Sequence, residues 1–197
     1  MTPLTVGALL LVGALFVLLA VGYRRENTAA VANTATAIAV TLVPRTVGWA
    51  LGVDSEAAGI SALTFWIAVA SVLHCLGMLG RYESVSWWDH LTHALSASLA
   101  AALLYAWLLV SGPERVASTT VIAGTLLGIL ALSVLWEIGE LLAREVARRY
   151  GIEPVLVHYG WRDTAFDLLF DIVGAALVVT LDLRLFVPTV ESIVRAI

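Results

Sequence analysis

Long apolar stretches limit the fold of this chain more than any other feature of its sequence. They cover residues 4–22, 28–52, 58–79, 90–111, 117–143 and 164–186. A helix of about 20 apolar residues spans the hydrocarbon core of a bilayer. The sequence therefore predicts an all-α polytopic membrane protein with about six transmembrane helices, and we expect residues 1–197 to form a single integral membrane domain.

The composition supports this interpretation. Hydrophobic residues make up 60% of the chain and charged residues only 13%, whereas a soluble domain is usually about a quarter charged. A soluble fold of this length could not hide so much apolar surface, so the bilayer must cover it. The first stretch lacks a basic segment before it and ends at Arg24 and Arg25 rather than at a cleavage site. We therefore expect a first transmembrane helix there rather than a signal peptide.

Charge and cysteine content exclude other classes of protein. The formal net charge is −4, all basic residues are arginines, and no basic patch stands out. This balance argues against a nucleic-acid partner. The single cysteine, Cys75, excludes a disulfide within the chain.

The arginines predict how the chain is oriented in the membrane. One side of a six-helix arrangement holds Arg24, Arg25, Arg81, Arg144, Arg148, Arg149 and Arg162, and the other holds Arg45, Arg115, Arg184 and Arg195. The side richer in arginine usually faces the cytoplasm. We therefore expect a multi-pass protein of the inner or plasma membrane with both termini outside the cytoplasm.

Ionisable residues gather at one end of four of these stretches. They are His74, then Asp89, His90 and His93, then Glu137 and Glu140, and finally Asp163, Asp167 and Asp171. Because successive helices run in opposite directions, all four sets are expected in the same leaflet. An ionised side chain at membrane depth costs at least about 2.5–3.5 kcal/mol, so such residues normally face the protein interior or a watery cavity.

The spacing of these residues places them on shared helix faces. Asp89 and His93 are four residues apart, and Glu137 and Glu140 are three apart. Repulsion among so many carboxylates must be relieved by protonation, by arginine partners or by bound cations. Arg81 and Arg162 are the nearest arginines that could neutralise two of the carboxylates; the remainder favours protonation or a metal.

A mixture of carboxylate and imidazole side chains on antiparallel helices is typical of metal sites. Zn²⁺, Mn²⁺ or Fe²⁺ suits this mixture better than Ca²⁺, which takes oxygen ligands. A metal-bound water beside a carboxylate base would give hydrolytic chemistry. Glu137 or Glu140 is the candidate general base. The candidate metal ligands are His74, Asp89, His90, His93, Asp163, Asp167 and Asp171.

Structural roles explain some of these residues equally well. Asp is favoured as a helix cap, and Asp89 opens a helix. Either His90 or His93 alone could be an interfacial packing residue. One hydrogen bond would account for His74 without any metal.

The second half of the chain resembles the YjdF-like family of bacterial and archaeal inner-membrane proteins, over roughly residues 70–180. The matching positions are Trp136, Glu137, Glu140, Asp163, Thr164, Asp167, Gly174 and Ala175. Arg162 departs from the family pattern, because it stands between Trp161 and Asp163, and the earlier helix reads WWDHLTH rather than a Gly-His run. A fainter similarity links the chain to VanZ-like proteins. The resemblance implies the fold and the choice of residues, and no reaction.

Three functions fit this sequence. The first is a metal-dependent hydrolase or transferase that acts on a lipid or isoprenoid headgroup at the cytoplasmic interface. The second is a transporter or channel for a cation or proton, since intramembrane carboxylates also mark ion paths. The third is a structural or partner-binding membrane protein in which the charges form a buried polar network.

Overall fold

The computed structural model describes residues 1–56, 59–112, 118–152, 154–156 and 160–197. Arg115 of the orientation argument lies outside these residues. Within the described part, all regular structure is helical. The long helices are α1 (Pro3–Arg24), α2 (Thr28–Ala50), α3 (Ile60–Leu76), α5 (Trp88–Ser111), α6 (Ser118–Tyr150) and α7 (Trp161–Thr180), and the short ones are the π-helix η1 (Gly77–Arg81), α4 (Tyr82–Ser84) and α8 (Val187–Ala196).

Five helical segments are long and apolar enough to cross a bilayer. They are α1, α2, the continuous run Ile60–Ser84, α5 and α6. The 20 residues of α7 span about 30 Å at 1.5 Å per residue, which is the thickness of the hydrocarbon core. The first turns of α7 carry four charged residues, but the helix is long enough to be a sixth membrane span. The expected all-α polytopic fold is confirmed.

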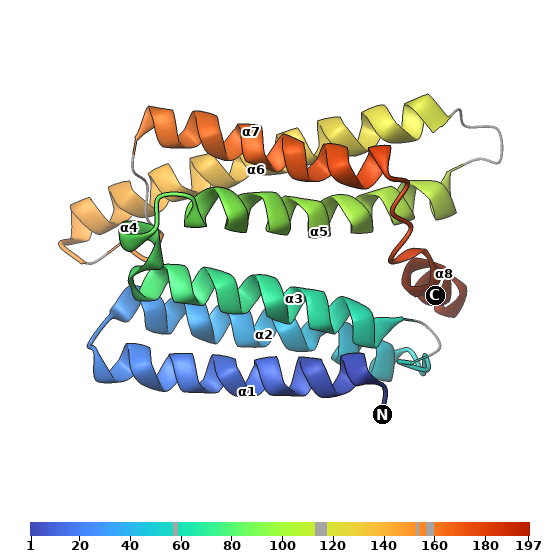
Figure 1. Cartoon of the computed structure of the whole chain (residues 1–197), viewed down its shortest axis with the longest axis horizontal. Helices are drawn as coiled ribbons and strands as arrows, with labels where there is room; N and C mark the ends of the chain where they lie inside the picture. Colours follow the sequence, from blue (N-terminus) through green and yellow to red (C-terminus); the bar gives the residue numbers. More distant parts are fainter. Residues whose placement is uncertain (57–58, 113–117, 153, 157–159) are drawn as a thin grey trace.

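The helices form two layers of three (Figure 1). Helices α1, α2 and α3 pack against one another in one layer, α5, α6 and α7 do so in the other, and α3 contacts α5 between them. One apolar core lies in the first layer, around Leu15, Ile38 and Cys75, and the other lies in the second layer, around Ala101 and Val178, and extends to Leu63 of α3. Both termini lie at the same end of the molecule, and the acidic helix ends lie at the other.

The two largest differences from the sequence-based expectation are at the ends of α6 and α7. Helix α6 continues beyond residue 143 to Tyr150 and carries Arg148 and Arg149 in its last turn, where positive charge complements the helix dipole. Helix α7 ends at Thr180 rather than at residue 186. Asp182 follows with a left-handed φ of 48°, which breaks the helix, and the amphipathic α8 begins at Val187.

A polar contact holds the segment between α7 and α8 in place. Tyr105, which is buried in α5, donates a hydrogen bond from its hydroxyl to Asp182 Oδ1 at 2.7 Å. Arg184 also donates to this carboxylate, from Nε at 2.9 Å. The hydrogen bonds from Arg184 and Tyr105 hold the pKa of Asp182 below its usual range. This contact ties the segment before α8 to the layer that carries the acidic residues.

The connection from α3 to α5 brings a tyrosine back over α3. Gly80 adopts a φ of 115° within η1, a conformation that L-residues with a side chain rarely reach. Asn27 donates from Nδ2 to the carbonyl oxygen of Met78 at 3.2 Å, so the α1–α2 loop supports this turn. As a result, Tyr82 packs closely over Gly77 and its hydroxyl reaches His74.

Candidate metal centre

His93 lies at the centre of three carboxylates. Its Nδ1 is 3.1 Å from Asp171 Oδ1, within hydrogen-bond distance. Its Nε2 is 3.7 Å from Asp167 Oδ1 and 3.9 Å from Asp89 Oδ1. Asp89 and His93 come from α5, and the two other aspartates come from α7. The structure therefore brings four of the predicted ligand residues together.

The two sides of the His93 ring have different partners. A carboxylate accepts hydrogen bonds, so Asp171 holds the proton on Nδ1 and leaves the Nε2 lone pair free in the neutral ring. Metal-binding histidines usually show this arrangement, in which a carboxylate binds one nitrogen and the metal binds the other. The sequence did not separate these roles, because Asp163, Asp167 and Asp171 fall on one stripe.

The space beside Nε2 has the dimensions of a cation site. Asp89, His93 and Asp167 each offer one ligand atom, and these three atoms lie within 4.8 Å of one another. Ligand bonds of about 2.0–2.2 Å to a central ion would bring such atoms together with small side-chain movements. Asp167 is only 2% exposed, and its Oδ1 has no hydrogen-bond partner among the described residues. A buried oxygen of this kind calls for a partner, such as an ion.

Close packing of α5 against α7 creates this geometry. A Cβ atom on Gly174 would lie 2.2 Å from the carbonyl oxygen of Ala94 and 2.9 Å from Ser98 Oγ. Ser98 also donates a hydrogen bond to the carbonyl oxygen of Gly174 at 3.1 Å. Gly174 therefore allows the two backbones to approach, as small residues do between membrane helices. It lies one turn beyond Asp171, so this approach sets the distance between Asp171 and His93.

The acidic residues of α6 lie beside this group. Glu140 is buried and accepts a hydrogen bond on Oε1 from Trp136 Nε1 at 2.9 Å. Sequence analysis missed this contact, although the spacing of four residues on one helix could have indicated it. Glu137 is also buried, and its Oε2 has no hydrogen-bond partner among the described residues.

The other two histidines occupy different surroundings. His74 contacts Tyr82 Oη through Nδ1 at 2.8 Å and Asn33 Oδ1 through Nε2 at 3.1 Å. Both of its ring nitrogens are thus engaged with protein groups. His90 stacks on Phe170, with 4.5 Å between ring centroids. The structure places neither side chain in the group around His93.

A cavity of about 570 Å³ opens from the acidic group and runs between the two layers. Its polar end is lined by Asp89, His93, Glu140, Asp163, Asp167 and Asp171, together with Asn33, His74, Tyr82 and Thr92. Apolar side chains line the rest, among them Val40, Ile67, Leu99, Leu103 and Ile129. The cavity thus joins an acidic site to an apolar groove inside the membrane-spanning part of the molecule.

The negative charge of this cavity is concentrated and lacks arginine. Asp89 lies within electrostatic range of Asp163 and Glu137, and Glu140 lies within range of Asp89. Among the described residues, no arginine lines the cavity. Arg81 and Arg162 are exposed, and the guanidinium of Arg162 lies over the ring of Trp161, 5.6 Å from its centroid. A cation would relieve the repulsion among these carboxylates.

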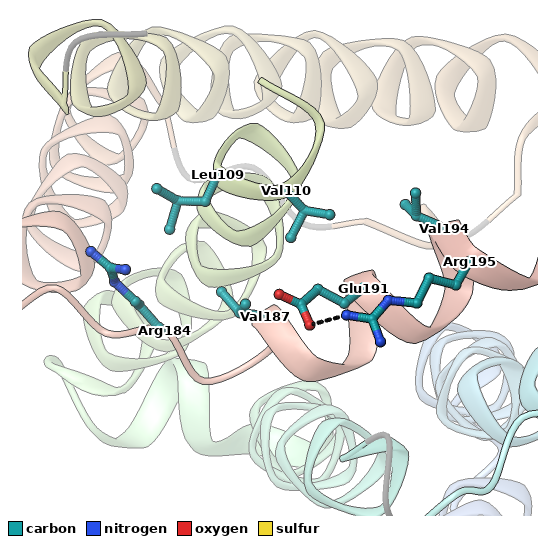
Figure 2. Close-up of a pocket in the computed structure, with 7 residues that line it drawn as sticks. All are labelled: Leu109, Val110, Arg184, Val187, Glu191, Val194 and Arg195. Atoms are coloured by element: carbon teal, nitrogen blue, oxygen red, sulfur yellow. Dashed lines mark hydrogen bonds and ion pairs between the residues drawn. The ribbon is translucent and has the colours of Figure 1, made fainter. Parts of the chain in front are cut away.

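A second hollow, of about 420 Å³, lies between α5 and α8 at the other end of the molecule (Figure 2). Its walls are formed by Leu109, Val110, Arg184, Val187, Glu191, Val194 and Arg195. Arg195 donates a hydrogen bond to Glu191 at 3.1 Å across one helical turn. This pair is exposed and self-neutralising, so the hollow offers no comparable site.

Comparison with known proteins identifies a family. A family model described as "Predicted membrane protein (DUF2238)" matches residues 5–187 of the chain. No curated protein and no solved structure matches the chain.

Proposed function

The chain belongs to the DUF2238 family of predicted membrane proteins, and we propose that it is a metal-dependent hydrolase or transferase that acts on a lipid or isoprenoid headgroup. The observation that carries this proposal is the division of the His93 ring between Asp171 at Nδ1 and the pair Asp89 and Asp167 at Nε2. The similarity to YjdF-like proteins, and more faintly to VanZ-like proteins, is part of the same proposal.

Three protein ligands are typical of a catalytic metal site, because they leave one position open for water or substrate. Asp89, His93 and Asp167 supply three ligand atoms, and Zn²⁺, Mn²⁺ or Fe²⁺ fits one imidazole with two carboxylates. A divalent ion held there would polarise a substrate oxygen and activate a water molecule. Asp171 would orient His93 rather than bind the ion directly. Asp163 lines the same cavity and is proposed as a further ligand of a five-coordinate ion, which still leaves a position open.

We propose a reaction that uses the groups that line the cavity. Glu140 would act as the general base and take a proton from water as the water oxygen attacks the carbonyl carbon of an ester or amide. The bond to the leaving group then breaks, and Glu140 returns the proton to that group. In a transfer reaction an alcohol takes the place of water. Glu137 lies one turn before Glu140 and is proposed as a second acid in the site.

The ion-transport alternative has less support. A transport path needs polar groups on both sides of the acidic cluster, but the cavity continues among apolar side chains such as Leu103 and Ile129. A purely structural polar network is also less favoured. Its polar atoms would satisfy one another, whereas Asp167 Oδ1 and Glu137 Oε2 are buried without hydrogen-bond partners among the described residues.

Metal analysis tests the proposed function directly. Element analysis of protein purified without chelator should give about one divalent transition-metal ion per chain, because the described residues contain one three-ligand group. Removing the ion with a chelator should lower the thermal unfolding temperature, and adding it back should restore that temperature. A preparation that holds no divalent ion, and that gains no stability from Zn²⁺, Mn²⁺ or Fe²⁺, would contradict the proposal.

We also propose that the acidic end of the molecule faces the cytoplasm and that both termini lie outside it. The end of the molecule that carries the acidic cluster also carries Arg24, Arg25, Arg144, Arg148 and Arg149. The positive-inside rule places these arginines in the cytoplasm. Cysteines introduced at position 2 or 197 should react with a membrane-impermeant thiol reagent in intact cells. Cys75 is buried and serves as the unreactive background. If the cysteines reacted only after cell lysis, the termini would lie in the cytoplasm and the proposed orientation would be wrong.

A further inference from the structure

The apolar part of the cavity has no part in the metal chemistry described above. We propose that it binds the hydrocarbon chain of a single-chain amphiphile whose head is uncharged or cationic. This inference deepens the proposed function and rests on it, because the head would lie at the acidic group. It adds the class of substrate that the site accepts.

The length of the whole cavity is similar to the thickness of one leaflet of a bilayer. Along α5 its lining residues run from Asp89 to Leu103, and along α6 from Glu140 to Ile129. These intervals correspond to about 21 Å and about 16 Å at 1.5 Å per residue. Half of the hydrocarbon core is about 15 Å thick. A chain in the groove would therefore reach from headgroup depth to the middle of the membrane.

The volume of the whole cavity limits which molecules can occupy it. A cavity of about 570 Å³ lies in the range of about 300–1,000 Å³ that is usual for small-molecule sites. A helix, at about 10–12 Å across with its side chains, would need more than about twice this volume over a length of about 16 Å. Helices α2 and α6 supply opposite walls through Val40 and Leu132. A single hydrocarbon chain thus suits the cavity better than a protein segment or a two-chain lipid.

The charge at the polar end of the cavity determines which head group of an amphiphile can bind there. Five carboxylates line it, from Asp89, Asp163, Asp167, Asp171 and Glu140, and no arginine does so among the described residues. One divalent ion would balance two of these charges. The remaining negative potential disfavours a phosphate head and favours an uncharged or cationic one. Hydroxyl and amide groups from Tyr82, Thr92 and Asn33 line the same end and could hydrogen-bond such a head.

Photo-crosslinking in lipid nanodiscs tests this proposal. The probe is a monoacylglycerol with a photoreactive palmitoyl chain. Peptide mapping should place the crosslinks on groove residues of α5 and α6, such as Leu99, Leu103 and Ile129. Unlabelled monopalmitoylglycerol should compete at least about tenfold better than hexadecyl phosphate, a difference of about 1.4 kcal/mol. Equal competition by the two amphiphiles would overturn the head preference, and crosslinks spread over the outer faces of α1 and α6 would overturn the groove.

A matched pair of variants tests where the chain lies. Ala100→Phe fills the groove and should reduce crosslinking at Leu103 at least about tenfold, because the added ring takes the space of part of the hydrocarbon chain. Ala123→Phe is the control, since Ala123 is exposed on α6. Ala70→Leu, on the opposite wall, offers a smaller filling should the larger one prevent folding. Undiminished crosslinking in the folded groove variants would overturn the proposal.

Metal content separates this inference from the proposed function. Ala100 lies about three turns from Asp89 along α5, so Ala100→Phe should retain the wild-type amount of bound ion. Wild-type protein that crosslinks in the groove but holds no metal would overturn the enzyme proposal alone. Protein that holds metal but does not crosslink in the groove would overturn the amphiphile proposal alone.

Discussion

Replacing His93 by alanine should abolish stoichiometric metal binding and weaken the affinity for the divalent ion at least about 100-fold. Loss of a group that only hydrogen-bonds to a metal ligand already costs about 10–100-fold. His93 is the only imidazole in the group of three ligand atoms. Removing it leaves Asp89 and Asp167 as two carboxylates without their shared neighbour. Isothermal titration with Zn²⁺ or Mn²⁺ would measure the affinity, and element analysis would measure the ion retained.

Graded effects should distinguish a ligand from a positioning residue. Asp167→Asn should approach the effect of His93→Ala, because it removes a charged ligand oxygen. Asp171→Asn should cost only about tenfold, because an amide oxygen can still accept the Nδ1 hydrogen of His93. Equal losses for the two aspartate variants would contradict the division of roles inferred from the His93 ring.

Two further variants serve as controls for the same measurement. His74→Gln should keep the metal, because both ring nitrogens of His74 are already hydrogen-bonded to protein groups. Asp182→Asn should also keep it, because this carboxylate lies after α7 at the other end of the molecule. Loss of metal in His74→Gln would return that residue to the ligand set that the sequence suggested.

The stability of Asp167→Asn separates a metal site from a structural polar network. Without metal, burial disfavours the charge of Asp167, and Asp89 and Asp163 repel that charge while His93 attracts it. The neutral amide should therefore raise the unfolding temperature of metal-free protein while lowering it when metal is present. A structural network would instead lose stability in both conditions, because one of its partners has been removed.

The sequence indicated the overall fold because bilayer physics leaves a clear pattern. Apolar stretches of about 20 residues, separated by short charged segments, have few alternatives to membrane-spanning helices. The alternating direction of such helices also indicated that the ends of α3 and α6 meet the starts of α5 and α7. The break at Asp182 was missed, because a left-handed residue between two apolar segments changes no hydropathy pattern.

The details of the site depend on distances that a sequence does not contain. Asp163, Asp167 and Asp171 follow one another at intervals of four residues, so all three looked equivalent. The contact of α5 with α7 at Gly174 decides that Asp171 meets Nδ1 of His93 while Asp167 faces Nε2. The three histidines were equally ambiguous in the sequence. In the structure, Tyr82 and Asn33 engage the two ring nitrogens of His74. The ring of His90 instead stacks on Phe170.

Substituting valine for Gly174 should destabilise the protein by about 3 kcal/mol and also remove metal binding, because overpacking at a close backbone contact commonly costs about 1–3 kcal/mol or more. The added Cβ would meet the carbonyl oxygen of Ala94 at 2.2 Å, and neither backbone can yield without moving a whole helix. The α5–α7 separation would then increase beside Asp171 and His93. Thermal unfolding in detergent and metal titration would measure the two effects.

A matched glycine shows whether the effect comes from this contact. Gly13 lies within α1, and a Cβ there would meet nothing within 4 Å. Gly13→Ala should therefore leave metal binding unchanged and stabilise the helix by up to about 1 kcal/mol. Gly174→Ala tests the minimal case, since a single methyl group already collides with backbone. If Gly174→Ala bound metal as the wild type does, the close approach of α5 and α7 would not be what sets the geometry around His93.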